Sequence, residues 1–280
     1  MDIEKNLEVW GHQYEWPESG EEWSESWGGS EAQWYGCLLP RLRRFLPASR
    51  IVEIAPGHGR WTHFLLEHCD SYIGVDIAQS CIEACTKRFA GAAADFRVTD
   101  GTTLTGVADR SIDLGFSFDS LVHAEEPVLR GYLEEFARTL SDEGVAFIHH
   151  SNMGAHLQRR TRVLKQRAFA AKVPGPGRIV QYALPKFART WQEHGRATSV
   201  TAEAFASWAA EAGLVCVAQE TLNWGQELTI DCISVVVRPD STWARPNVIV
   251  RNTSFMEEAA STNRVATAYL SLVNRRGTSG

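Results

Sequence analysis

The chain has 280 residues, 44% of them hydrophobic, and carries a formal net charge of −6 at pH 7. That length and composition can bury one substantial core with a small appended lid. The acidic balance argues against a nucleic-acid partner, whose binding domains are usually basic. No apolar run reaches the ~18 residues of a membrane span. The polar, acidic first residues lack the basic and apolar regions of a signal peptide, so we expect a cytoplasmic protein.

The first segment, residues 1–48, holds half of the ten tryptophans in a stretch without regular periodicity. These tryptophans are Trp10, Trp16, Trp23, Trp27 and Trp34. Indole rings at this density are costly to leave in water. We therefore expect the segment to pack over the main domain as a lid, or to form the contact in a homo-oligomer, with a helix near residues 30–46.

After residue 48, short apolar runs alternate with amphipathic segments. Strands are predicted over residues 50–55, 71–76, 95–98, 111–118 and 144–149, and helices over 60–69, 78–90 and 128–140. Uniformly apolar strands are buried on both faces, and their alternation with helices is typical of a parallel sheet. The predicted fold class is therefore α/β and Rossmann-like, with helices on both faces of the sheet.

Residues 152–200 interrupt this alternation. Between residues 155 and 200 we count ten Lys or Arg against one acid, and Pro174-Gly175-Pro176-Gly177 breaks any regular element. The alternation then resumes with a helix over residues 201–212. Two strands follow, over residues 214–222 and 229–238, and the short turn between them predicts an antiparallel hairpin.

This pattern predicts a mostly parallel sheet of seven strands, of which the last two form the hairpin. We divide the chain into a Trp-rich N-terminal lid (1–48), a main domain (49–238) with a substrate-covering insertion after the fifth strand (152–200), and a C-terminal extension (239–280). The extension contains a predicted helix near residues 254–273. A nicotinamide dehydrogenase would instead have six parallel strands.

A short loop joins the first predicted strand to the first helix and reads EIAPGHGR over residues 53–60. Gly57 and Gly59 allow the backbone to turn tightly and to approach a ligand without a Cβ clash. The helix N-terminus that follows favours an anionic group. Asp76 ends the second strand, where an acid can hydrogen-bond both hydroxyls of a ribose. Asp100-Gly101 ends the third strand, where the carboxylate can accept from an adenine amino group.

These segments, Glu53-x-Ala55-x-Gly57-x-Gly59, Gly74-Val75-Asp76 and Asp100-Gly101, resemble the first three motifs of class I S-adenosylmethionine (SAM) dependent methyltransferases. The resemblance covers roughly residues 50–150, and the predicted hairpin extends it to residue 238. Ala55 stands where the family usually has glycine. A dinucleotide loop would need G-x-G-x-x-G, which this loop does not have.

The resemblance implies that SAM is the cofactor and that residues 49–238 are a SAM-binding methyltransferase domain. By this resemblance, Glu53 is expected to bind the methionine end of SAM, Asp76 the ribose and Asp100 the adenine. The other cofactor-binding residues expected are Ala55, Gly57, Gly59, Ile77, Gly101 and Phe118.

Methyl transfer to a hydroxyl needs an oriented nucleophile and a group that removes its proton. In an open α/β sheet the substrate lies beyond the carboxyl ends of the strands, so polar residues after the fourth and fifth strands are candidates. We favour His150 or His123 as the general base, because histidine titrates near neutral pH, with Asp119 orienting the base or the substrate. His149 and His150 point to opposite faces of a strand, so only one of them is expected in the site.

The residues expected to contact the acceptor are His149, Asn152, Arg196 and Trp224. The basic residues of the insertion either form a solvated face or recognise phosphate or carboxylate, and Arg196 is the first candidate for recognition. Trp224 would stack on a sugar or an aromatic ring, or pack in the core.

A divalent metal held by Asp119, His150, Asn152 and Asp231 is an alternative. The chain lacks the adjacent Asp-Asp or Asp-Asn pair that is common in metal-dependent O-methyltransferases, and we predict no metal.

The overall pattern is similar to small-molecule methyltransferases of bacterial secondary metabolism and surface-sugar pathways. This similarity implies O-methylation of a hydroxyl on a sugar or natural-product scaffold, with or without an acidic or phosphorylated group. Transfer to carbon or nitrogen is an alternative. So is a SAM-binding protein that transfers no methyl group or catalyses a cyclisation. The expected partner is a small-molecule acceptor, with neither nucleic acid nor membrane.

Overall fold

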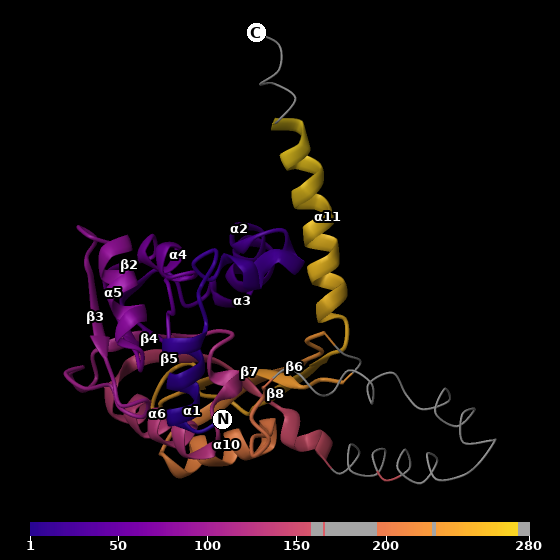
Figure 1. The fold of residues 1–280 in the computed structure, drawn as a ribbon. Coiled ribbons are helices and arrows are strands. Elements are labelled where there is room, and N and C mark those ends of the chain that lie inside the picture. Colours follow the sequence, from indigo (N-terminus) through magenta and orange to yellow (C-terminus); the bar gives the residue numbers. More distant parts are fainter. Residues whose placement is uncertain (158–164, 166–194, 226–227, 274–280) are drawn as a thin grey trace.

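The structure, a computed structural model, describes residues 1–157, 165, 195–225 and 228–273. An eight-stranded sheet lies at its centre, in the order β3-β2-β1-β4-β5-β7-β6-β8 (Figure 1). The strands are β1 (Ala48–Ile54), β2 (Cys69–Asp76), β3 (Ala94–Val98), β4 (Ile112–Ser117), β5 (Leu140–Ser151), β6 (Val215–Leu222), β7 (Asp231–Val237) and β8 (Val248–Asn252).

The first five strands are parallel, and β7 is antiparallel to both β5 and β6. The predicted antiparallel hairpin of the last two predicted strands is therefore confirmed. The chain runs outward from β1 through β2 to β3 and then returns to place β4 on the other side of β1. Such a reversal opens a crevice at the carboxyl ends of β1 and β4, where ligands of α/β sheets bind.

Two hydrophobic clusters cover the two faces of the sheet. One is built on α6 (Glu126–Thr139) and α10 (Ala202–Glu211), where Leu129, Leu133 and Phe136 recur at helical spacing and pack with Phe205. The other unites α4 (Thr62–Leu66) with both ends of the chain and includes Trp34. The helix α5 (Gln79–Arg88) packs against β2 and β3.

The N-terminal segment is helical but irregular. Its elements are α1 (Ile3–Asn6), the π-helix Leu7–Gln13, the 3₁₀-helix Glu21–Trp27, α2 (Ser30–Gln33), a π-helical turn (Trp34–Leu38) and α3 (Leu39–Leu42). The predicted helix over residues 30–46 is thus a succession of three short helical pieces that ends at residue 42.

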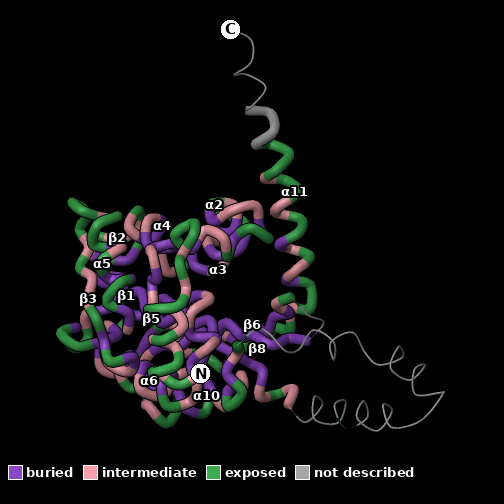
Figure 2. Tube along the Cα trace, viewed as in Figure 1, coloured by how far each residue is buried: buried purple, intermediate pink, exposed green. Residues whose placement is uncertain are grey.

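The long helix α11 (Phe255–Val273) packs its first half on this segment and then runs away from the body of the molecule (Figure 1). The Asn263 amide donates to the Glu25 carbonyl at 2.8 Å, and Thr262 lies against Gly36. The burial pattern agrees, because the described far turns of α11 are mostly exposed (Figure 2). None of the described helices is long and apolar enough to cross a bilayer.

The predicted count of seven strands is wrong, because β8 adds an eighth that pairs in parallel with β6. Val248, Ile249 and Val250 are 51%, 67% and 51% exposed at the sheet edge. An edge strand exposed on both faces has no alternation of apolar and polar residues, which is the signal that identifies half-buried strands. The 239–280 extension therefore contributes to the same sheet as the main domain.

Candidate active site

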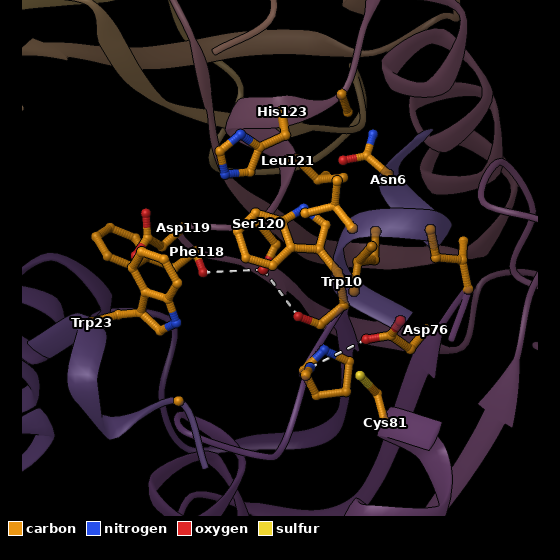
Figure 3. Close-up of a pocket in the computed structure, with 18 of the residues that line it drawn as sticks. Asn6, Trp10, Trp23, Asp76, Cys81, Phe118, Asp119, Ser120, Leu121 and His123 are labelled. Atoms are coloured by element: carbon orange, nitrogen blue, oxygen red, sulfur yellow. Dashed lines mark hydrogen bonds between the residues drawn. The ribbon is translucent and has the colours of Figure 1, made fainter. Parts of the chain in front are cut away.

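A cavity of about 450 Å³ lies at the carboxyl ends of the central strands. Its wall combines the loop after β1, the end of β2, the segment after β4 and the N-terminal residues Trp10, Trp16 and Trp23 (Figure 3). Residues from distant parts of the chain, Arg196 and Trp224, complete it. The cavity thus occupies the crevice that the strand order creates.

The loop after β1 takes left-handed backbone at three positions, with φ of +55° at Ala55, +57° at Gly57 and +86° at Gly59. The indole of Trp16 stands 2.6 Å from where a Cβ of residue 57 would lie, so only glycine admits this packing. Trp16 also stacks on His58 at a ring distance of 4.6 Å. The N-terminal segment therefore packs directly against the glycine loop.

Asp76 presents a carboxylate in the cavity wall at the end of β2 (Figure 3). Its two oxygens accept backbone N–H groups from Gly57 at 3.2 Å and from Ala78 at 2.9 Å. Burial raises the pKa of Asp76 to about 6. Each carboxylate oxygen has a second acceptor position, so the group can also receive a ribose diol. With Ile77 and Gly101 beside it in the wall, this arrangement fits the adenosine half of SAM.

Two predicted cofactor residues lie behind the wall instead. Glu53 accepts from the hydroxyls of Thr62 at 2.8 Å and Tyr72 at 2.5 Å, and burial raises its pKa to about 7. Asp100 is exposed and accepts backbone N–H groups of the next turn, including that of Thr102 at 2.8 Å. Of the nine predicted cofactor residues, the cavity wall contains Ala55, Gly57, Asp76, Ile77, Gly101 and Phe118 but not Glu53, Gly59 or Asp100.

The segment after β4 brings Asp119 into the wall with left-handed backbone, at a φ of +64°. One carboxylate oxygen lies 3.0 Å from Arg60, and the other lies 3.9 Å from Arg196. The Asp119 backbone N–H donates to Nδ1 of His149 at 3.0 Å. A strained backbone held by side chains on both sides is typical of functional positions.

Arg196 lies between Asp119 and a second, more deeply buried carboxylate, that of Asp231. The Arg196 guanidinium donates to both oxygens of the fully buried Asp231, from Nε to Oδ1 at 3.1 Å and to Oδ2 at 3.3 Å, and from Nη2 to Oδ2 at 2.8 Å. Burial would raise the pKa of Asp231, but Arg196 outweighs it and holds that pKa well below its ordinary range. Nε2 of His149 lies 3.5 Å from the same carboxylate. Since Nδ1 of His149 accepts a hydrogen bond, its proton is assigned to Nε2.

His149 is therefore a support for the wall and is not among the residues lining the cavity. Its ring is fully buried and stacks on Phe118 at 4.5 Å. The predicted alternation along β5 holds, because His150 points to the other face.

The structure does not bring His150 to the cavity. Its ring is fully buried and stacks on Phe205 of α10 at 4.1 Å, while Nε2 lies 2.8 Å from the Ser234 hydroxyl. Burial lowers its pKa to about 3. Asn152 is likewise occupied by backbone, donating to the Thr229 carbonyl and accepting from Ala202 N–H. Neither residue is placed to meet an acceptor in this cavity.

His123 does line the cavity, in contact with Trp10 at a ring distance of 5.2 Å. Its Nδ1 lies 3.0 Å from the Gly195 carbonyl and so donates to it, which leaves Nε2 as an acceptor. Burial, with the nearby Arg196, lowers the pKa of His123 to about 4. The imidazole is therefore neutral at physiological pH.

Several wall residues escaped the sequence reasoning. Arg60 and Trp61 directly follow the glycine loop and line the cavity. The local sequence pattern does not show which of the N-terminal tryptophans face the cavity. Of the basic residues in the 152–200 insertion, Lys165 and Arg196 are described, and the others lie outside the described residues. No group of three or more described His, Cys, Asp or Glu side chains is arranged to hold a metal ion.

The fold and cavity together define a class of protein. The terminal antiparallel hairpin separates this sheet from the all-parallel sheet of dinucleotide enzymes, and the acid at the end of β2 is placed to hold a ribose. Residues 51–144 match a family described as a methyltransferase domain. A search of curated proteins found no matching sequence.

Solved structures give the same fold at low identity. A Leishmania major SAM-dependent methyltransferase is 12% identical with a TM-score of 0.56, covering 84% of this chain and 82% of that one. A methyltransferase in complex with the Haloferax volcanii Trm112 activator is 17% identical with a TM-score of 0.52, covering 80% and 96%. A Methanosarcina mazei SAM-dependent methyltransferase is 16% identical with a TM-score of 0.50, covering 71% and 97%. Residues 51–144 are a methyltransferase domain, so the chain is an enzyme, and SAM is its cofactor.

Proposed function

We propose that this enzyme transfers the methyl group of SAM to a hydroxyl of a small molecule, a sugar or a natural-product scaffold, with His123 as the general base. The observation that carries the proposal is the position of the His123 imidazole in the cavity wall. Its Nδ1 is bonded to the Gly195 carbonyl, and no described residue hydrogen-bonds Nε2. An imidazole that is fixed through Nδ1 in the wall of a cofactor site can accept a hydroxyl proton at Nε2.

When bound, SAM supplies an electrophilic methyl group on a sulfonium. That methyl group would be transferred to the acceptor oxygen with S-adenosylhomocysteine as the leaving group, and Nε2 of His123 would accept the hydroxyl proton. Asp76 would hold the ribose, and Asp119, fixed by Arg60 and His149, would orient the acceptor. Orientation of this kind accounts for a large part of the rate enhancement in bimolecular transfers.

The division of the chain into a lid (1–48), a SAM-binding domain (49–238) and an extension (239–280) is part of this proposal. The contact of Trp16 with Gly57 supports a covering role for the N-terminal segment. In this arrangement the lid excludes water from the reacting atoms.

Transfer to nitrogen is the second candidate, and the indole-rich wall favours it. Trp10, Trp23 and Trp224 line the cavity, and aromatic faces bind cationic amines through cation–π attraction. NMR of the product distinguishes an O–CH₃ group from an N–CH₃ or C–CH₃ group.

The proposal is tested with His123→Ala on an acceptor that the wild-type enzyme methylates, by measuring S-adenosylhomocysteine formation. Loss of a general base should lower kcat by about 10²- to 10⁴-fold, with the SAM dissociation constant unchanged. The matched control is His68→Ala, which removes an imidazole stacked on Trp34 outside the cavity. Near-full turnover by His123→Ala would contradict the proposal that His123 is the base of an O-methylation. Tight SAM binding without turnover on any acceptor would favour a protein that transfers no methyl group.

A further inference from the structure

The cavity has two halves of different chemistry. Asp76 and Cys81 lie on one side in the close-up, while Trp23, Phe118 and Asp119 lie on another and His123 lies beyond them (Figure 3). The half away from Asp76 is here called the acceptor compartment, and its residues are Trp10, Trp23, Phe118, Asp119, His123 and Trp224. Its nature determines which acceptor it can receive, under the proposed function above.

Aromatic surface dominates the acceptor compartment. Trp23 is 40% exposed, and Trp10 and Trp224 are half-buried, so all three indoles keep apolar area that a ligand could cover. Trp10 and Trp23 meet edge to face at 5.8 Å, and Trp224 lies 6.1 Å from Phe118. Rings arranged in this way bury most apolar area against a flat apolar ligand.

The compartment carries no surplus charge. Two guanidinium groups, of Arg60 and Arg196, face two carboxylates, of Asp119 and Asp231, so the formal charges cancel. His123 is neutral, and His149 accepts at Nδ1. A phosphate or carboxylate would approach Asp119, and an ammonium group would approach two arginines. The wall therefore offers no net attraction to an acceptor of either sign.

Few polar groups in the compartment remain to meet an acceptor. The Ser120 hydroxyl donates to the Ala55 carbonyl at 3.0 Å, and one Asp119 oxygen is paired with Arg60, so that its other oxygen is left to orient the acceptor. Among the described residues, no hydrogen bond is made by Nε2 of His123, and the indole N–H of Trp61 is buried in the wall without a partner. A sugar ring would place several hydroxyls against indole faces, and each hydroxyl that stays unpaired costs about 1–3 kcal/mol.

We infer that the acceptor is a neutral planar molecule with one or two hydroxyls, of the phenol type, stacked among Trp10, Trp23 and Trp224. This inference rests on the proposed function, since it names the substrate class of the same site. Its hydroxyl would reach His123, and its ring would fill the space between the indoles.

The test uses the full chain saturated with S-adenosylhomocysteine and four probes, with dissociation constants measured by calorimetry and tryptophan quenching. The probes are β-naphthol, the β-naphthoate anion, the naphthylmethylammonium cation and methyl glucoside. We expect β-naphthol to bind at least ~10-fold more tightly than each of the others. Tighter binding of methyl glucoside or of either charged probe would overturn the inference.

Variants locate the binding. Trp23→Ala removes a partly exposed ring with little risk to folding and should weaken β-naphthol binding about 5- to 10-fold. Trp224→Leu should do the same. The control is Trp243→Ala, because the ring of Trp243 packs on Phe45 outside the cavity. This variant should leave the β-naphthol affinity unchanged. Equal β-naphthol affinity in Trp23→Ala, Trp224→Leu and wild type would contradict the inference.

Failure of the proposed function gives a different result. If the transferred methyl is found on nitrogen or carbon, or if His123→Ala keeps full turnover, base-assisted O-methylation is wrong even though β-naphthol binds best. If an ionic or sugar hydroxyl is methylated with dependence on His123, the proposed function stands and the inference about the acceptor is wrong.

Discussion

Replacing Asp231 with asparagine removes the carboxylate to which Arg196 donates hydrogen bonds at 3.1, 3.3 and 2.8 Å. The Asp231 side chain is 0% exposed and that of Arg196 is 7% exposed, so water cannot take the place of the lost charge. Removing one partner of a buried pair costs ~3–5 kcal/mol of stability. Asp119 still lies 3.9 Å from Arg196 in the variant, so we expect a value near the lower end, about 3 kcal/mol.

The effect has a defined pH dependence. Because the folded-state pKa of Asp231 lies below its unfolded value, its contribution is fully present above the unfolded pKa of about 3.9 and is lost as the pH falls toward the folded value. The asparagine side chain of the variant does not titrate. The difference in unfolding free energy between wild type and Asp231→Asn should therefore be largest at neutral pH and shrink below about pH 4.

The assay is urea unfolding followed by tryptophan fluorescence, at neutral pH and near pH 3.5, as estimated from the unfolded pKa. Glu211→Gln is the control, because it breaks the Arg130–Glu211 pair whose side chains are 36% and 55% exposed, and should cost at most ~1 kcal/mol. Adding Arg196→Met to Asp231→Asn removes the stranded guanidinium and should recover part of the loss. Equal costs for Asp231→Asn and Glu211→Gln would refute the reasoning, as would simple additivity in the double variant.

Three further outcomes are expected. Asp76→Asn should weaken SAM binding about 10- to 100-fold by calorimetry, because hydrogen bonds to a charged group are worth ~1.5–3 kcal/mol; an unchanged affinity would exclude the ribose role. Ala55→Gly should raise the unfolding free energy by up to ~1 kcal/mol, since a φ of +55° suits glycine; a loss in urea unfolding would contradict this. Since the pKa of His123 is about 4, it should stay deprotonated above that pH, and kcat/KM for a non-ionising acceptor should fall only toward that value. An inflection near the ordinary histidine pKa of about 6.5 would contradict it.

The parts of the fold that the sequence predicted are those with a local signal. The apolar runs of β1 and β2 and the turn between β6 and β7 are contiguous patterns, and Asp76 follows directly from the end of a strand. β8 has no such signal, because its three aliphatic residues are exposed and its place depends on a pairing with β6 about thirty residues away. The local strand propensity of residues 248–252 does not predict a pairing between segments so far apart in the sequence.

The candidate site was predictable only in part for the same reason. Alternation along β5 separates His149 from His150, but it does not say which face holds the cavity, and the structure places His149 behind Phe118 and His150 against α10. Arg196 was a candidate for binding an acidic group because it ends a basic segment. Its pairing with Asp231 joins residues 35 positions apart and neutralises that charge. Charges that compensate one another across the fold look like surplus charges in a sequence.

This pairing also bears on what relatives can say about the reaction. The residues that fit SAM, from the glycine loop through Asp76 to Gly101, all lie within the matched methyltransferase domain of residues 51–144. Half of the residues of the proposed acceptor compartment lie outside it, Trp10 and Trp23 before the domain and Trp224 after it. Proteins that share the domain therefore inform the cofactor, while the indoles and the compensated charges would have to set the acceptor. Exchanging residues 1–48 between related enzymes should alter acceptor choice more than SAM affinity.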